Sequence, residues 1–566
     1  MKRKLAVMLA GSMLAAIILS SCTGKQEVQQ SQTPAATSGT QASAVPTEKG
    51  EPVTLTITTS VSDQIPLDES NNAIKYIQDH TNTKLKFNVL PSTDPDAKFN
   101  LLLASGDYGD VVAKEVQRAQ VMQLGMVDKI FIPLNNYIKN NSVYLKKLMV
   151  ENPQYEQLAY AKDGNIYGFI KIDEAYHTQA YPKLWINQNW LKTLNISEPQ
   201  TTEEFYNMLV AFRDKDPNGN NKKDEVPLTG SIDWSCPTAS YLMNSFIPFD
   251  LQGVEAGAAS MSYAKDGKVI FSADKEAFRE GLRYVKKLVD EKLLDVASFT
   301  QKSDQMQQVV RQEPSPVGAY TADHFAMGID LNNKEMDKAI VALPPVAGPE
   351  GVRLQPKIDF RDRTGNFTFF VTDKCKNPEA AFMLGDFMLD KECEMTRRHG
   401  PEGSGWGKLE KPLPSALGLE ALYWINSDYG AAGGAKEKDT LWIPPFDDSY
   451  ASRQLSDPVP EDLYIPESYE ARLTIETQKV IKYFYPEYLP KNIEIYMENQ
   501  DEISYFTEIR LNLQNFVRTS IAQFATGEKS LDKDWDSYTN QLKQYQLEEY
   551  LTIYQKYFDQ FKKLGE

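Results

Sequence analysis

The chemistry most clearly indicated by the sequence is calcium binding, in the segment DKDPNGNNKKDEVPL at residues 214–228. Ca²⁺ takes about six to eight oxygen ligands, and oxygen-bearing side chains recur here at alternate positions. Gly219 permits a tight turn, and Lys222 would contribute its backbone carbonyl. The alternative is a polar Asn-Gly turn that holds no ion. The predicted ligands are Asp216, Asn218, Asn220, Lys222, Asp224 and Glu225.

The spacing of this loop departs from that of an EF-hand, in which an acidic residue at the twelfth position closes the site. Counted from Asp216, the twelfth residue is Pro227, so Glu225 would have to close the site two positions early. We therefore expect a structural calcium loop rather than a sensor. The helix before it is predicted to begin at the capping box Thr201–Glu204.

A second set of residues suits a saccharide. Sugar rings present flat C–H faces, which aromatic rings complement, and their hydroxyls pair with charged or polar groups. Asp107 and Tyr108 end a predicted helix beside a strand, where α/β folds bind ligands. For each candidate, packing in the core or at the surface is the alternative. The predicted ligand-binding residues are Asp107, Tyr108, Trp234, Asp323, Arg361, Trp406, Trp424 and Trp442.

The first residues predict export and lipid anchoring. Lys2, Arg3 and Lys4 precede an apolar stretch from Leu5 to Leu19, which is typical of a signal peptide. The sequence Leu19-Ser20-Ser21-Cys22 has the pattern of a bacterial lipobox, in which the cysteine is acylated and becomes the mature N-terminus. Ordinary cleavage with a free cysteine is the alternative. Residues 23–50 contain no aromatic residue, Leu or Ile, so we expect a flexible tether.

Composition excludes several classes of protein. The 566 residues exceed one compact core, and the formal charge of −17 disfavours nucleic acid as a partner. Four cysteines do not make a disulfide scaffold, although Cys375 and Cys393 could pair or remain buried thiols. The four histidines lie far apart in the sequence and have no metal-ligand spacing.

The elements that would position these residues alternate between strand and helix. Strands are predicted at 53–59, 85–90, 111–112, 164–170, 184–186 and 367–371, and helices at 73–80, 98–104, 277–293 and 378–389. The last hundred residues are strongly helical, with one helix ending at Gly527. This order predicts a two-lobed α/β fold built on parallel strands, with crossovers between the lobes.

The predicted division of the chain has six segments. They are a signal peptide (1–21), the lipidated Cys22 with its tether (22–50), the first part of the N-lobe (51–180), the first part of the C-lobe with the calcium loop (181–355), the return of the N-lobe (356–395) and a mostly helical segment completing the C-lobe and the cleft (396–566).

Residues 185–228, from WINQNW to KKDEVPL, resemble the extracellular solute-binding proteins of carbohydrate ABC transporters. The similarity is to the large lipoprotein subgroup that includes alginate-oligosaccharide binders, and further matches are LLLASGDYGDVV (101–112), KNPEAAFMLGDFM (376–388) and FATGEKSLDKDWDSYTNQL (524–542). The resemblance implies a Venus-flytrap fold, capture of the ligand in the cleft and delivery to a membrane permease. In alginate binders the six positions named above hold calcium. One departure is the long turn from His399 to Trp406, where the family has a shorter Gly-Glu-Gly turn before an aromatic residue.

The predicted function is therefore that of a lipid-anchored, monomeric binding protein that captures an oligosaccharide for import by an ABC permease, with structural calcium. Two alternatives remain open: a cell-surface polysaccharide-processing enzyme, and a receptor that presents its ligand to a membrane sensor. Paired carboxylates are plentiful, but the sequence has no Walker loop, HExxH, GxSxG or Cys–His signature. We accordingly expect no catalytic residues.

Overall fold

The computed structural model describes most of the chain after residue 49. The described residues are 50–61, 65–91, 95–151, 156, 158–171, 176–233, 237–251, 261–358, 366–426, 429, 437–445, 459, 462–465, 468–487, 489–491, 493–497 and 499–564.

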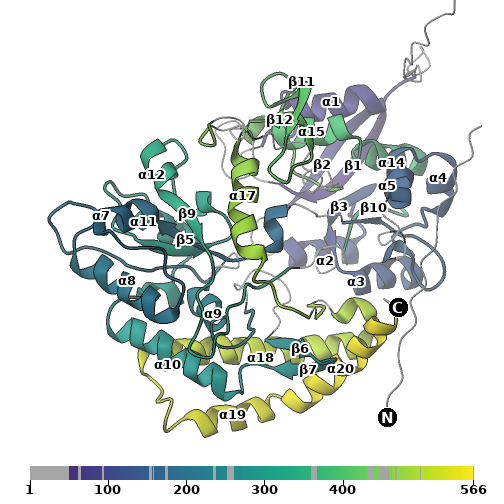
Figure 1. The fold of residues 1–566 in the computed structure, drawn as a ribbon. Helices are drawn as coiled ribbons and strands as arrows, with labels where there is room; N and C mark the ends of the chain where they lie inside the picture. The colour runs from purple at the N-terminus through teal and green to yellow at the C-terminus, as the bar shows by residue number, and fades with distance from the viewer. Residues whose placement is uncertain are drawn as a thin grey trace, which may run out of the picture. The chain divides into compact units, whose positions relative to one another are not determined.

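The first lobe is built on a five-stranded sheet of order β2-β1-β3-β10-β4 (Figure 1). β1 pairs in parallel with β2 and β3, whereas β10 lies between β3 and β4 and is antiparallel to both. The strands are β1 (Val53–Ser60), β2 (Thr83–Leu90), β3 (Val111–Val116), β4 (Phe169–Ile170) and β10 (Phe367–Val371). The helices of this lobe are α1 (Asn72–Thr81), α2 (Pro95–Ser105), α3 (Arg118–Met122), α4 (Asn135–Asn140), α5 (Tyr144–Glu151), α14 (Pro378–Phe387) and α15 (Lys391–His399).

Both faces of this sheet are buried. Successive residues of β3 point to opposite faces, so Val111 and Ala113 join one hydrophobic cluster and Val112 joins the other. A strand buried on both faces reads as a continuous apolar run, as FTFFV in β10 does. The predicted strands and helices of this lobe are therefore confirmed, except that β4 is confined to the last two residues of the predicted run 164–170.

The second lobe contains a three-stranded antiparallel sheet of order β8-β5-β9. Its strands are β5 (Lys183–Asn187), β8 (Ala319–Ala322) and β9 (Ile340–Leu343), and a separate hairpin consists of β6 (Ser262–Lys265) and β7 (Lys268–Phe271). Its helices are α7 (Gln188–Leu194), α8 (Thr202–Asp214), α9 (Thr238–Met243), α10 (Glu276–Asp290), α11 (Ser303–Val310) and α12 (Lys334–Ala339). The predicted capping box is present, because the Thr201 hydroxyl accepts a hydrogen bond from the amide of Glu204 at 3.1 Å.

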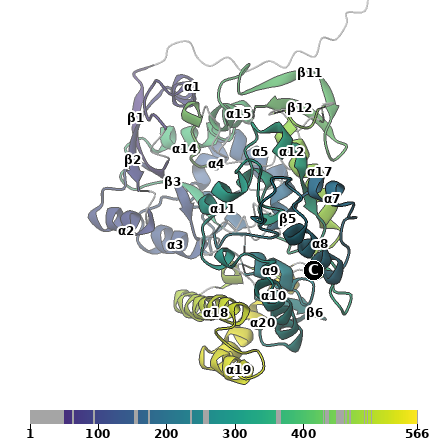
Figure 2. The same ribbon diagram turned by 90° about the vertical axis from the view of Figure 1, so that its left-hand side faces the viewer.

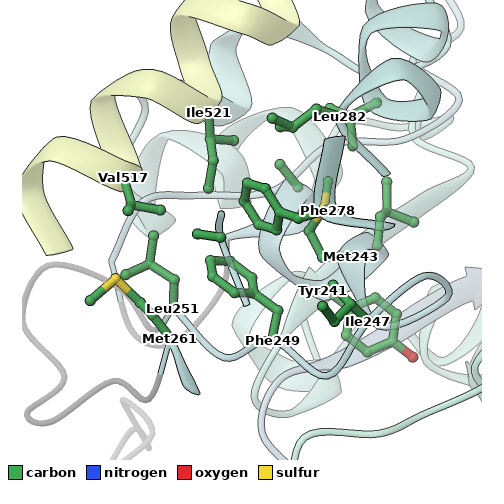
Figure 3. Close-up of a cluster of buried hydrophobic side chains, with 14 of the residues drawn as sticks. Tyr241, Met243, Ile247, Phe249, Leu251, Met261, Phe278, Leu282, Val517 and Ile521 are labelled. Atoms are coloured by element: carbon green, nitrogen blue, oxygen red, sulfur yellow. The ribbon is translucent and has the colours of Figure 1, made fainter. Parts of the chain in front are cut away.

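The C-terminal helices complete the core of the second lobe. They are α18 (Gln500–Thr526), α19 (Trp535–Gln544) and α20 (Leu547–Leu564). α18 packs against α10, and α19 and α20 pack against α18 and against each other (Figures 1 and 2). Figure 3 shows Ile521 of α18 near Phe278 and Leu282 of α10, and Val517 of α18 near Leu251 and Met261. Gly527, with φ of 80°, ends α18 as predicted.

The described elements alternate between the lobes, so the chain crosses from one to the other three times. The crossovers lie between Ile170 and Lys183, between Leu343 and Phe367, and between Ile443 and Tyr469. The predicted segmentation puts all of 396–566 with the second lobe, but Leu441 and Ile443 pack in the core of the first lobe. The hairpin of β11 (Trp406–Pro414) and β12 (Glu420–Ile425) also follows α15 of that lobe. After the third crossing, α17 (Tyr469–Ile481) packs against β9. Cys375 and Cys393 are both free thiols.

Candidate functional site

The crossovers identify which edge of each sheet faces a ligand. The first crossover leaves β4 after Ile170 and enters β5 at Lys183. At the same edge of the second-lobe sheet β8 ends at Ala322, which pairs with Lys183 and is followed by Asp323 and His324. In open α/β sheets, ligands bind outside the carboxyl ends of strands. The candidate site therefore begins at Lys183 and Asp323.

Lys183 holds this edge together although it is completely buried. Its ammonium group donates hydrogen bonds to the backbone carbonyls of His177, at 3.0 Å, and of Asp323, at 3.2 Å. It thereby ties the first crossover to the end of β8. Burial lowers the pKa of Lys183 to about 7, although the charges of Asp323 and Glu476 act in the opposite direction.

Asp323 has a carboxylate oxygen without a partner. The residue is 6% exposed, and its Oδ1 atom accepts no hydrogen bond from any described residue. Burial holds the pKa of this carboxyl well above its usual range; the charge of Lys183 counteracts burial, while Asp250 and Asp233 add to it. A buried acceptor left unsatisfied costs about 1–3 kcal/mol, so this oxygen favours a ligand that donates a hydrogen bond.

The two neighbouring aspartates are satisfied by the protein. Asp233 accepts hydrogen bonds from the amide and hydroxyl of Ser303, at 2.8 and 3.2 Å. Asp250 forms a buried ion pair with Lys491, which comes from the segment before the C-terminal helices. This edge thus combines residues from distant parts of the chain around one oxygen to which no described residue donates a hydrogen bond.

The edge of the first-lobe sheet at which β3 and β4 end carries charges that are already paired. β3 ends at Val116, and Glu115 accepts from Lys171 at 2.9 Å and from the Asn366 amide at 2.5 Å. Lys171 and Asn366 flank β4 and β10, where two crossovers begin and end. Beyond β3, the guanidinium of Arg118 donates to the carbonyls of Leu158 and Tyr160.

Three histidines that are distant in the sequence lie around one carboxylate. His177 Nδ1 is 3.3 Å from Glu470 in the first turn of α17, and both His324 and His399 interact electrostatically with this glutamate. Burial acts to raise the pKa of Glu470, but His177, His399 and His324 act together in the opposite direction and the pKa is lowered. Burial lowers the pKa of His324 and of His399 to about 3, so both are neutral near pH 7. Spacing gave no sign of this cluster.

Among the predicted aromatic residues, Trp442 lies beside this histidine cluster. Its ring centroid is 6.3 Å from that of His399, and the Arg398 guanidinium lies 4.2 Å from its centre. Trp406, by contrast, is 1% exposed and packs against Met395, Ile425 and Tyr423. Trp424 is half-buried in β12, opposite Gly407. Trp406 is therefore a core residue of the hairpin, because its pairing with Ile425 of β12 brings its ring against the side chains of that strand.

Asp107 and Tyr108 lie at the opposite edge of the first-lobe sheet from the crossovers. They precede β3, so they stand at its amino end rather than its carboxyl end, and the sequence pattern did not distinguish the two. Asp107 is exposed in a polar hollow of about 390 Å³ lined by Thr56, Asn88, Gly106, Asp107, Gly109, Asp110 and Lys374. Tyr108 is buried, and its hydroxyl donates to Asp373 at 2.5 Å.

Three of the predicted residues lie outside the described part of the chain. They are Cys22, Trp234 and Arg361. In the sequence Trp234 directly follows Asp233, and Arg361 lies within the second crossover.

The predicted calcium loop folds back on itself. The Asp216 carboxylate accepts from the amides of Asn220 and Asn221, at 3.1 and 2.9 Å. Asn220 Oδ1 accepts from the amide of Lys222 at 2.7 Å, and its Nδ2 donates to both carboxylate oxygens of Asp224 at 3.1 Å. Asp216 and Gly219 adopt positive φ of 45° and 70°, a conformation that Asp tolerates and Gly favours.

The donor set of this loop fits calcium. Glu225 Oε1 is buried and has no hydrogen-bond partner among the described residues. Burial, and then the charges of Asp216 and Asp224, raise the pKa of Glu225. No group of three or more His, Cys, Asp or Glu side chains suited to a metal was found in the described chain, so the fit depends on the amide oxygens and the Lys222 carbonyl as well.

Residues 67–393, more than half of the chain, match the family of bacterial extracellular solute-binding proteins. The chain belongs to this family. The fructooligosaccharide ABC transporter substrate-binding protein FusA of Streptococcus pneumoniae is 25% identical to this solute-binding protein over 495 residues, which cover 82% of each chain.

Solved structures share the fold of this solute-binding protein. A FusA EF-hand mutant in complex with fructo-nystose has a TM-score of 0.72 at 22% identity, covering 90% of this chain and 99% of that chain. The alginate-binding protein AlgQ2 without calcium ion has a TM-score of 0.65 at 23% identity, covering 90% and 98%. The predicted two-lobed fold is confirmed, and membership of a family of binding proteins agrees with the prediction of a non-enzymatic function. Within the described residues, no helix has both the length and the apolar character needed to cross a membrane.

Proposed function

We propose that this solute-binding protein captures an oligosaccharide between its lobes and delivers it to an ABC permease. The observation that carries the proposal is the unpartnered Oδ1 of Asp323, at the sheet edge that the first crossover enters. A sugar hydroxyl can donate to this oxygen. The similarity to the fructooligosaccharide-binding protein FusA and to the alginate-binding protein AlgQ2 supports a saccharide ligand.

Trp442 is the aromatic residue best placed to stack on a sugar ring, because it is half-buried beside His399 and Arg398. Trp234 and Arg361 are further candidate contacts, since they follow Asp233 and lie in the second crossover. Closure of the lobes would be a hinge motion of the crossovers, which the ligand stabilises by binding the closed state more tightly. Moderate stabilisation allows release to the permease.

Two further features complete the proposal. Acylated Cys22 anchors the folded body to the bacterial cell membrane outside the cytoplasm, and residues 23–50 act as its tether. The loop from Asp216 to Glu225 holds one structural Ca²⁺ in the second lobe. The EF-hand of FusA and the structure of AlgQ2 without its calcium ion support this assignment. The body acts as a monomer.

A thermal-shift screen over oligosaccharides tests the proposal, because a ligand that binds the native state raises its melting temperature. We expect at least one oligosaccharide to stabilise the protein and to remain intact after long incubation. Steady cleavage of the bound saccharide would instead identify an enzyme. Co-purification with a membrane sensor kinase rather than a permease would identify a presenting receptor. Cys22→Ser should release the body from the membrane or block its processing.

A further inference from the structure

The charges around the unpartnered oxygen of Asp323 bear on the kind of saccharide that fits. The buried carboxylates of Asp233, Asp250 and Asp323 interact electrostatically, and two buried lysines, Lys183 and Lys491, accompany them. Burial favours the neutral forms of Asp323 and Lys183, because it raises the pKa of the carboxyl and lowers that of the ammonium group. The net charge is −1 whether these two groups are both ionised or both neutral, since Asp233, Asp250 and Lys491 leave one unbalanced negative charge. A second negative charge brought by a ligand would be repelled here.

The hydrogen-bonding requirement of Asp323 points in the same direction. Its Oδ1 needs a donor. A sugar hydroxyl both donates and accepts, whereas the carboxylate of a uronic acid only accepts. A uronate group at this position would therefore leave Oδ1 without a donor and would add a negative charge to a cluster whose net charge is already −1.

The described cations at both sheet edges are already engaged by the protein. Lys183 binds two carbonyls and Lys491 pairs with Asp250. On the first lobe, Lys171 pairs with Glu115 and Arg118 donates to two carbonyls. Recognition of a uronate would require an Arg guanidinium or a Lys ammonium group directed at its carboxylate.

The histidine cluster supplies no free positive charge either. His177 lies against Glu470, and His324 accepts from or donates to the Tyr469 hydroxyl at 2.9 Å. The second crossover, at 359–365 (DFRDRTG), lies outside the described residues, but its two Asp and two Arg sum to zero formal charge.

Resting on the proposed function, we infer that the ligand is an uncharged oligosaccharide rather than a uronic-acid oligomer. Asp323 receives a hydroxyl donor from it, and the buried carboxylates exclude the acidic class.

Titration calorimetry of the purified protein with two sets of oligosaccharides, each three to four sugars long, tests the inference. The uncharged set holds fructo-, malto-, xylo-, manno- and galacto-oligosaccharides, and the acidic set holds oligoalginate and oligogalacturonate. Methyl-esterified oligogalacturonate is a matched pair for its acid, because the sugar chain is the same and each carboxylate is replaced by an uncharged methyl ester. We expect an uncharged probe to bind at least about 100-fold more tightly than every acidic one, which is about 2.7 kcal/mol.

Tighter binding of an acidic probe would overturn the inference and leave the proposed function standing. In that case Arg361 would be the first candidate for binding the ligand's carboxylate, and loss of acidic-probe binding in Arg361→Gln would identify it as that group. Binding of neither set would remove the proposed function and this inference together.

Asp323→Asn sharpens the test, since the amide keeps the shape of the side chain and offers a donor as well as an acceptor. We expect it to weaken the uncharged ligand about tenfold or more and to reduce the preference over its acidic counterpart. Asp536→Asn, at an exposed position in the first turn of α19, is the matched control and should change neither. An unchanged preference in a folded Asp323→Asn variant would contradict the role of Asp323.

Discussion

The calcium loop and the sheet edge at Asp323 have the same feature at their centre: a buried carboxylate oxygen with no described partner. In the loop, Glu225 is surrounded by the acidic side chains of Asp216 and Asp224. At the sheet edge, Asp323 has Lys183 beside it as well as Asp250 and Asp233. An uncompensated cluster of oxygens suits a cation, whereas a carboxylate near a lysine suits a neutral donor. A buried carboxylate oxygen without a described partner thus indicates a cation in one place and a neutral hydrogen-bond donor in the other, and the surrounding charges determine which ligand fits.

Of the changes that test this comparison, removal of calcium should have the largest effect on the stability of the protein. Chelation should lower the melting temperature by several degrees, since a ligand at 1000 times its dissociation constant stabilises by about 4 kcal/mol. Asp216→Ala should abolish the sensitivity to chelator. Lys222→Ala is the matched control and should retain it, because the backbone carbonyl is the ligand. Calorimetric melting with and without chelator measures all three proteins, and a metal-saturated wild type indifferent to chelator would refute the site.

The pH dependence of stability should distinguish Lys183 from an ordinary surface lysine. Its pKa of about 7 lies below the value of about 10.4 expected in the unfolded chain. Between these values the unfolded chain binds one more proton, so the free energy of unfolding rises with pH. Below pH 7 both states are protonated and the full cost of the buried charge is present.

Urea unfolding at pH 7 and pH 9.5 measures this rise in the ligand-free protein. In the wild type, the free energy of unfolding should rise between these pH values by an amount on the order of 2 kcal/mol, given about 1.4 kcal/mol for each pKa unit. Lys183→Met should not show this rise. Lys268→Met, an exposed lysine at the start of β7, should keep the wild-type slope. Equal slopes in wild type and Lys183→Met would show that Lys183 titrates normally.

Replacement of Trp442 should affect binding more than folding. Trp442→Ala should weaken saccharide binding by about tenfold, or 1.4 kcal/mol, because the ring is half-buried and available for stacking. Trp406→Ala should instead destabilise the ligand-free protein, since that ring is 1% exposed. Calorimetric titration and melting of both variants separate the two roles; a large loss of stability in Trp442→Ala with unchanged affinity would reverse the assignment.

The smallest expected effect is the energetic coupling between calcium binding at Glu225 and saccharide binding at Asp323. Their hydrogen-bonding partners are separate, so chelation should change saccharide affinity by less than about 0.5 kcal/mol. Asp323→Asn should correspondingly keep the sensitivity to chelator. A double-mutant cycle of Asp216→Ala and Asp323→Asn, followed by saccharide affinity, measures the coupling. A coupling of several kcal/mol would mean that calcium organises the saccharide site.

Local patterns predicted the elements well. The apolar runs of β1, β2 and β10, the capping box at Thr201 and the stop at Gly527 depend on neighbours within a few residues, and each was confirmed. The edge at which a residue lies was harder to predict. Asp107 stands at the amino end of β3 because strand direction within a sheet depends on pairing with β1. Trp406 was misjudged because its burial depends on the partner strand β12.

The sequence by itself determined the order of strands and helices and the oxygen-rich loop between Asp216 and Glu225, whose donors lie within ten residues of one another. Only the tertiary structure decided which groups meet at Asp323, because Lys183, Asp233 and Asp250 come from separate segments and Asp250 is in turn paired with Lys491. It likewise brought His177, His324 and His399 to Glu470. Spacing along the chain determines a site whose residues are close in sequence, whereas a site assembled from separate strands and helices exists only once those elements have packed.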